Sequence, residues 1–175
     1  GWDKGVISTL KHFVAYGIPE GGHNGNPSNV GERDLHENFL PAFQAAVDAG
    51  ALSVMTSYNS IDGVPSTGNP ELLRRILKEE WGFDGFVVSD LVSIDGLFSD
   101  HHIAKDKEDA GIIAMNAGVD VDLGANCYVL LKEAVETGKI KASVINEAVA
   151  RVLRLKFELG LFDNPYVDPD YAEAE

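Results

Sequence analysis

Residues 85–90 read GFVVSD, an apolar run that ends in a serine and an aspartate. A short, continuous apolar run of this kind is typical of a strand covered on both faces, as in a parallel sheet. In α/β proteins, ligands bind at the carboxyl ends of such strands, so Asp90 stands where functional side chains gather. The same position also suits an aspartate that caps a helix or forms a turn.

The strand–loop–helix unit around residues 85–90 recurs along the chain. Further strands are predicted at 6–14, 51–58 and 119–123, and helices at 34–50 (with Asp34 as the N-cap), 70–82, 105–116, 128–136 and 142–161. Four strands alternating with helices indicate an α/β domain with a parallel sheet. Two architectures fit: an open doubly wound sheet, or a partial (β/α)8 TIM-type barrel of about four βα units with a long C-terminal helix. A complete barrel needs about 250 residues, and this chain has 175.

The composition of the chain excludes several classes of function. The formal net charge is −14 and the sequence pI is about 4.6. This balance argues against non-specific binding to nucleic acid and against binding to an anionic membrane surface. No apolar run is long enough to predict a membrane span. The single cysteine, Cys127, excludes an intrachain disulfide framework and leaves the compartment open.

Polar side chains also stand near the ends of the first two predicted strands. Lys11 and His12 end the first strand, and Met55 and Tyr58 lie in the last part of the second. Together with Asp90, these residue types suit a sugar or phosphate-ester site. Each also has a structural explanation, because a lysine at a strand end can reach solvent and methionine and tyrosine commonly fill cores.

Other polar pairs are expected to be structural. Asp120 and Asp122 alternate with valines and are interpreted as a solvated or hydrogen-bonded strand end. His101 and His102 are adjacent and point apart, and the chain has no HxxxH spacing, so no metal site is predicted. The absence of a GxGxxG motif or a phosphate cradle before a helix disfavours a dinucleotide enzyme or a phosphotransferase.

Several of these stretches resemble one known family. The match is to the β-glucosidase branch of glycoside hydrolase family 3, through Lys11-His12-Phe13, MTSYN at 55–59, WGFDGFVVSD at 81–90, NAGVD at 116–120 and AVARVLR at 148–154. The ten residues that end at Asp90 are the most specific of these signals. The similarity covers nearly the whole chain and corresponds to the second half of the family's catalytic barrel.

The resemblance implies a retaining β-glycosidase that removes terminal β-D-glucosyl or related residues through a covalent glycosyl–enzyme intermediate. Asp90 would be the nucleophile. Lys11 and His12 would bind sugar hydroxyls, and Met55 and Tyr58 would line the same pocket. No metal or other cofactor is implied.

The resemblance also implies partners for the chain. Residues 1–162 would form the C-terminal half of the barrel, and 163–175 an extended tail or linker. An N-terminal half-barrel would grip the sugar, and a following α/β-sandwich domain would supply the acid/base glutamate, so the isolated chain is expected to be inactive. For the full-length enzyme, a periplasmic or secreted location is favoured over the cytoplasm. Leu91, directly after Asp90, departs from the family, because many members have tryptophan there.

Half a barrel is expected to have open strand edges and an inner face that meets water, including Val54, Val87 and Val121 or their immediate neighbours. A homodimer of half-barrels could close such a ring. The alternative to an enzyme is a non-catalytic half-barrel that binds a sugar or a protein partner.

Overall fold

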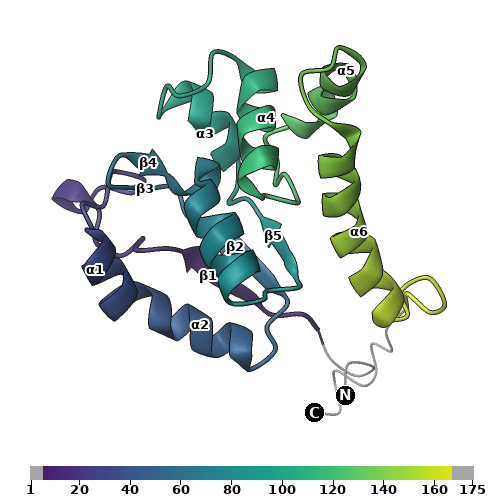
Figure 1. Cartoon of the computed structure of the whole chain (residues 1–175), viewed down its shortest axis with the longest axis horizontal. Helices are drawn as coiled ribbons and strands as arrows, with labels where there is room; N and C mark the ends of the chain where they lie inside the picture. Colours follow the sequence, from purple (N-terminus) through teal and green to yellow (C-terminus); the bar gives the residue numbers. More distant parts are fainter. Residues whose placement is uncertain (1–5, 167–175) are drawn as a thin grey trace.

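A parallel sheet of three strands lies at the centre of the computed structural model, which describes residues 6–166 (Figure 1). Its strands are in the order β1 (Thr9–Phe13), β2 (Ser53–Thr56) and β5 (Phe86–Val88). A single parallel bridge between Val88 and Val121 extends the ladder. The segment predicted as a fourth strand therefore contributes one bridge and no full strand.

Helical segments follow each strand, as parallel pairing requires. In chain order they are η2 (Glu20–Gly22), α1 (Glu32–Asp34), η3 (Leu35–Phe39), α2 (Leu40–Asp48), η4 (Ser66–Gly68), η5 (Glu71–Glu80), α3 (Ser93–Ser99), α4 (Lys107–Ala117), η6 (Tyr128–Leu130), α5 (Leu131–Glu136) and α6 (Ala142–Glu158). The short hairpin β3 (Ser60–Ile61) and β4 (Val64–Pro65) lies between β2 and η4. Figure 1 shows α2 below the strands, α3 and α4 above them, and α6 along one side.

Two local predictions differ from the structure. Asp34 is not an N-cap: it is the last residue of α1, and Gly31 precedes that helix in an extended conformation. Helix α3 was not predicted, because Gly96 interrupts its apolar pattern. The residue before it, Val92, has φ +64°, which is unusual for a β-branched side chain.

The core lies between the sheet and its helices. Val54 and Val87 are fully buried and share one apolar cluster with Leu73 and Leu77 of η5. The expectation that Val54 and Val87 face water is therefore wrong, whereas Val121 is only half-buried. Because side chains alternate along a strand, the opposite face of β2 carries Met55 instead.

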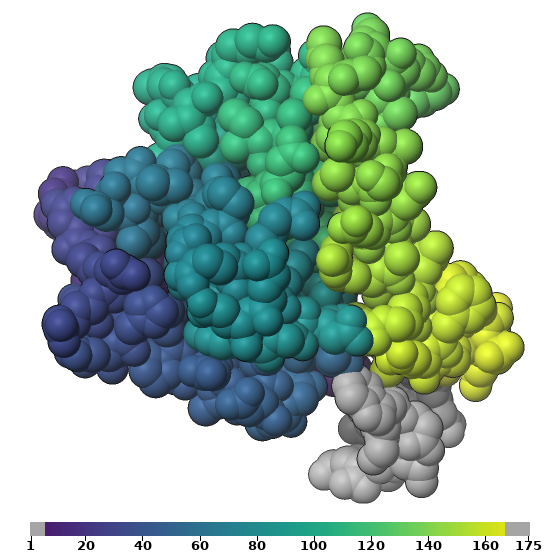
Figure 2. Space-filling model, in the orientation of Figure 1, coloured from purple at the N-terminus to yellow at the C-terminus, as the bar shows by residue number. Residues whose placement is uncertain are grey.

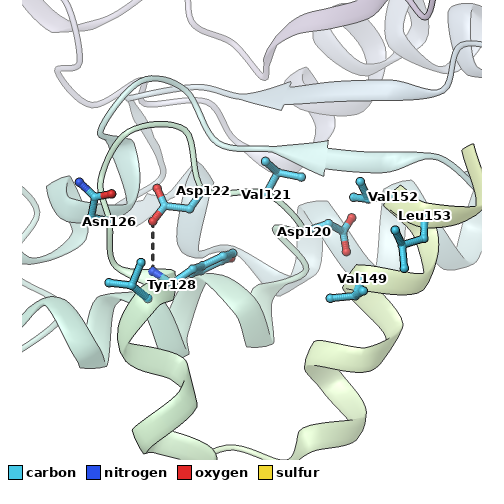
Figure 3. A pocket seen from close by; sticks show the side chains of 9 residues that line it. Asp120, Val121, Asp122, Asn126, Tyr128, Val149, Val152 and Leu153 are labelled. Carbon is cyan, nitrogen blue, oxygen red and sulfur yellow. Dashed lines mark hydrogen bonds between the residues drawn. The ribbon is translucent and has the colours of Figure 1, made fainter. Parts of the chain in front are cut away.

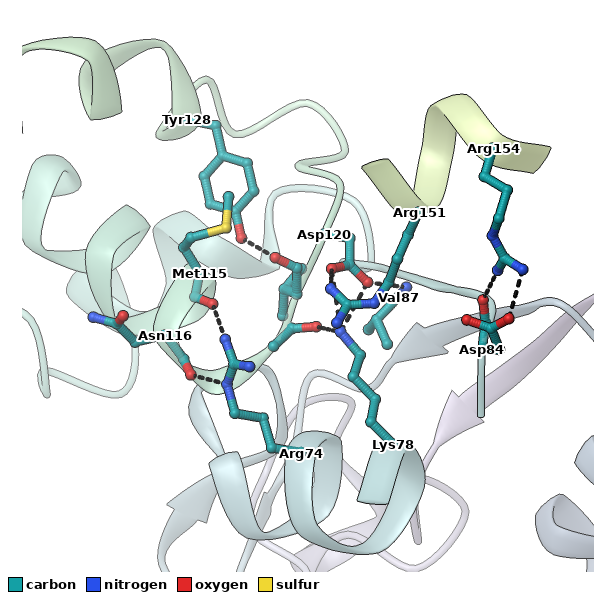
Figure 4. Close-up of polar contacts among 12 residues, drawn as sticks. Arg74, Lys78, Asp84, Val87, Met115, Asn116, Asp120, Tyr128, Arg151 and Arg154 are labelled. Atoms are coloured by element: carbon teal, nitrogen blue, oxygen red, sulfur yellow. Dashed lines mark hydrogen bonds and ion pairs between the residues drawn. The ribbon is translucent and has the colours of Figure 1, made fainter. Parts of the chain in front are cut away.

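A buried carboxylate, Asp120, holds α6 against the sheet (Figure 4). Its Oδ2 lies 2.9 Å from Nζ of Lys78 on η5, and its Oδ1 lies 3.1 Å from Nη1 of Arg151 on α6. Oδ2 also accepts the Val87 N–H of β5 at 2.8 Å. Burial, only partly offset by Asp120, lowers the pKa of Lys78 to about 8. One side chain thus ties together three elements.

The neighbouring carboxylate, Asp122, organises the loop that follows. It accepts the backbone N–H groups of Ala125, Cys127 and Tyr128, at 3.0, 2.8 and 3.1 Å. Figure 3 shows the bond from Tyr128. The hydrogen-bonded interpretation of Asp120 and Asp122 is therefore confirmed.

Helix α6 stands as a column along one side of the molecule (Figure 2). Its apolar side chains Val149, Leu153 and Phe157 remain exposed. A groove of about 360 Å³ between α6, η6 and residues 120–122 is lined by Val121, Val129, Val149 and Leu153 (Figure 3). Among the helices of residues 6–166, none is long and apolar enough to cross a membrane.

The chain beyond α6 begins with a turn. The N–H groups of Asp163 and Asn164 both donate to the Gly160 carbonyl. The predicted tail at 163–175 is therefore not extended at its start. Its remainder, 167–175, lies outside the described residues, as do residues 1–5 of the predicted barrel half.

Candidate active site

Asp90 lies two residues beyond β5, where the strand opens into a loop, and is only 9% exposed. Its Oδ1 accepts the Leu91 N–H at 2.7 Å, and its own N–H points to Thr56 Oγ1 at 3.4 Å. Its Oδ2 lies 3.5 Å from Nε2 of His12. The carboxylate is thus contacted by Leu91 and His12, and the backbone of Asp90 by Thr56 at the end of β2.

The Lys11–His12 pair comes from β1, at the point where the ladder to β2 loses its regular register. The peptide bonds Lys11–His12 and Phe13–Val14 are both cis. The half-buried His12 faces Asp90, and burial lowers its pKa more strongly than the Asp90 charge raises it. Lys11 is exposed, and it forms no ion pair within residues 6–166. His12, rather than Lys11, is therefore the partner beside the carboxylate.

Tyr58 lies two residues beyond β2 and reaches across to the same loop. Its Oη donates to the Leu91 carbonyl at 2.7 Å. Burial, followed by the negative charge of Asp90, raises the pKa of Tyr58 to about 12. The phenol therefore stays a protonated donor at neutral pH. Met55, also from β2, is half-buried and in register with Val88.

A further aromatic side chain, which no sequence motif indicated, lies beside His12 and Tyr58. The ring of Tyr16 lies with its centroid 4.6 Å from that of His12 and 6.1 Å from that of Tyr58. Tyr16 sits in the long loop after β1. The glycines and prolines of this loop are typical of a long loop, but they do not show which of its residues turns inward.

A chain of buried hydroxyls beneath Asp90 was also missed. Thr67 Oγ1 lies 2.9 Å from Thr56 Oγ1 and 3.1 Å from Ser93 Oγ. Thr56 could have been noticed within the MTSYN run. Thr67 and Ser93 carry no local signal, because only the tertiary fold brings them together.

A cavity of about 710 Å³ adjoins the wall formed by Tyr58 and Leu91. Its volume lies within the usual range for small-molecule sites. Its remaining lining is largely polar and includes Asn24, Asn26, Ser93, Ser99, Asp100 and His101. In residues 6–166, no group of three or more His, Cys, Asp or Glu side chains is arranged to hold a metal ion.

The sequence matches the model of the glycosyl hydrolase family 3 N-terminal domain over residues 2–155. The chain belongs to this family. A β-xylosidase of Formosa agariphila is 42% identical over 167 residues, which is 90% of this chain and 23% of the relative. A periplasmic β-glucosidase of Salmonella typhimurium is 38% identical over 162 residues, which is 92% of this chain and 21% of the relative.

Solved structures of the family share the fold seen here. The crystal structure of a β-glucosidase from Listeria innocua superposes with a TM-score of 0.89 at 41% identity, over 92% of this family 3 chain and 22% of that protein. The recognition of family 3 from the strand-end motifs is thus confirmed. The chain spans roughly a fifth of the length of the relatives it matches.

Proposed function

We propose that this chain carries the nucleophile side of the active site of a retaining β-glycosidase. The observation that supports the proposal best is the setting of Asp90. It is a nearly buried carboxylate at a strand end, oriented by the Leu91 N–H at 2.7 Å and faced by His12. A nucleophilic carboxylate needs a fixed orientation of this kind.

In the proposed reaction, an Asp90 carboxylate oxygen attacks the anomeric carbon as the bond to the leaving-group oxygen breaks. A proton donor protonates that oxygen, and a glycosyl ester forms on Asp90. Water then attacks the anomeric carbon, loses a proton to the same donor residue and releases the sugar and the free carboxylate.

The other predicted residues act on the sugar and on the nucleophile. The exposed ammonium of Lys11 and the imidazole of His12 donate to sugar hydroxyls. The protonated phenol of Tyr58 holds the loop that carries Asp90, and the half-buried Met55 offers apolar surface to the sugar ring. Charge-assisted hydrogen bonds of the Lys11 type are worth about 1.5–3 kcal/mol each.

We further propose that the chain is one part of a longer enzyme. It forms half of a (β/α)8 barrel of about four βα units, and the rest of the polypeptide supplies the other half and the proton donor. The supporting observations are the open sheet edges and the share of about 22% that the chain covers in its relatives. A homodimer of half-barrels is the competing way to cover the same edges. The substrate is a terminal β-glucosyl or related residue, such as the xylosyl group that the name of one relative indicates.

The test is a panel of aryl β-glucosides and β-xylosides assayed with the full-length protein. Asp90→Ala is expected to lower the turnover of the best substrate by about 10⁴-fold or more. The control is Asp48→Asn, which removes an exposed carboxylate at the end of α2. Turnover by Asp90→Ala at a near-normal rate would contradict the role of Asp90. If the wild-type protein binds glucosides without turning any over, the non-catalytic alternative is correct.

A further inference from the structure

His101 contacts the candidate active site, although its pairing with His102 in the sequence offered no chemistry. Its Nε2 lies 2.8 Å from the backbone carbonyl of Tyr58. A carbonyl oxygen can only accept, so Nε2 carries the proton and donates. The next residue, His102, uses its other ring nitrogen, Nδ1, at 3.0 Å from the Phe98 carbonyl. The two histidines therefore have separate partners.

The contact of His101 closes a loop-to-loop clamp around Tyr58. The segment 91–101 begins at Leu91, whose carbonyl accepts from the Tyr58 hydroxyl, and ends at His101, which donates to the Tyr58 carbonyl. On the other side, the Ser57 N–H donates to the carbonyl of Phe13 at 3.1 Å. Tyr58 is thus held by the same segment through both its side chain and its backbone.

The clamp leads directly to the nucleophile. Leu91 accepts from Tyr58 through its carbonyl and donates its N–H to Oδ1 of Asp90. A shift of the Tyr58 backbone would move its hydroxyl away from the Leu91 carbonyl, in the Leu91–Val92 peptide. Leu91 would then lose a contact that holds it in place, and the N–H that it donates to Asp90, in the Asp90–Leu91 peptide, would be less firmly oriented. We propose that His101 is a positioning residue that sets the place of Tyr58 and, through Leu91, the orientation of Asp90. This inference rests on the proposed function of Asp90.

The first test is a set of His101 variants in the full-length enzyme. Loss of the clamp in His101→Ala is expected to lower kcat/KM for an aryl β-glycoside by about 10- to 100-fold, because small misplacements of reacting groups have effects of this order. The amide nitrogen of glutamine reaches about as far as Nε2, whereas that of asparagine replaces Nδ1. His101→Gln is therefore expected to restore most of the activity, and His101→Asn is not.

The matched control is His102→Asn, which keeps a donor at the Nδ1 position and tolerates the left-handed backbone there, with φ +55°. It is expected to leave kcat/KM unchanged. Equal kinetics of His101→Gln and His101→Asn would overturn the proposal. This comparison decides the question even if His101→Ala fails to fold.

The second test is a double-mutant cycle with Tyr58→Phe, which removes the hydroxyl that His101 is proposed to place. If His101 acts through that hydroxyl, His101→Gln and His101→Asn should differ less than about threefold in the Tyr58→Phe background, because effects of residues that act as a unit are not additive. A merely structural role would give the same ratio in both backgrounds and overturn the inference. Asp90→Ala is measured alongside: if it retains activity, the proposed function itself fails, whatever the cycle shows.

Discussion

Removal of the Asp120 carboxylate is expected to be among the most destabilising single changes in the chain. In Asp120→Ala, the ammonium of Lys78 would remain in a site where its side chain is only 8% exposed, with the Gly118 carbonyl as its remaining partner at 2.7 Å. The N–H of the buried Val87 would also lose its acceptor. Arg151, with a side chain 25% exposed, would turn to solvent more easily.

The magnitude follows from these contacts. Breaking a buried ion pair by removing one partner costs about 3–5 kcal/mol. An unsatisfied buried N–H costs about 1–3 kcal/mol. Lys78 can lose its proton in the variant, which reduces the first of these costs, so we expect a total of about 4 kcal/mol, a large fraction of the stability of a typical domain.

The assay is urea unfolding of the 175-residue chain followed by far-UV circular dichroism, with Lys78→Met as the matched variant. Lys78→Met leaves Asp120 paired with Arg151 and Val87, so it is expected to cost less than half as much as Asp120→Ala. The double variant should be more stable than Asp120→Ala alone, since no buried ammonium is left unpaired. A loss below about 1 kcal/mol in Asp120→Ala, or a double variant no better than it, would refute the reasoning.

The same pair predicts a pH dependence. The pKa of Lys78 is lowered from 10.5 to about 8 in the folded chain. Between these values the unfolded chain binds more protons, so the contribution of Lys78 to the free energy of unfolding rises as the pH increases from about 8 to 10.5. This rise should be present in the wild type and absent in Lys78→Met.

Three further predictions concern the site. Spectrophotometric titration, taken as the difference between wild type and Tyr58→Phe, should show Tyr58 ionising near pH 12. Asp90→Asn should lower the pKa of Tyr58 but leave it above 10, because burial is a larger cause of the shift than the charge of Asp90. Since the folded pKa is raised, the stability linked to Tyr58 is complete below pH 10 and is lost as the pH rises from 10 to 12; a Tyr58 pKa near 10 in the wild type would contradict the geometry. Val92→Gly should raise the free energy of unfolding in urea by about 1 kcal/mol, because glycine relieves the left-handed backbone before α3, and a destabilisation would contradict the assigned strain. In the full-length enzyme, Lys11→Ala should lower kcat/KM with little change in Tm, since Lys11 is exposed; a large fall in Tm with unchanged specific activity would show a structural role instead.

Much of the sheet could be predicted because its strands are local apolar patterns. The runs that contain Val54 and Val87 form β2 and β5, paired in parallel as the strand–helix alternation indicated. The side of the sheet on which these valines lie could not be predicted. Periodicity shows which residues share a face, but which face is covered depends on the placement of η5 and the other helices.

The candidate site was predictable to the extent that strand ends meet at one edge of a parallel sheet. This rule brings His12, Tyr58 and Asp90 together, and the structure agrees. It does not resolve which member of the Lys11–His12 pair faces Asp90, because the irregular register of β1 decides that. It also misses His101, whose partner is a backbone carbonyl 43 residues away and leaves no trace in the sequence.

The central claim is that Asp90 forms a covalent bond to the sugar. The most direct measurement is to treat the full-length enzyme with a 2-deoxy-2-fluoro-β-glucosyl fluoride, which slows hydrolysis of the glycosyl ester, and to locate the label by peptide mass spectrometry. The account predicts one fluoroglucosyl group per chain, carried on Asp90 and absent from Asp90→Ala. A label on any other carboxylate, or inactivation of Asp90→Ala at the wild-type rate, would contradict it.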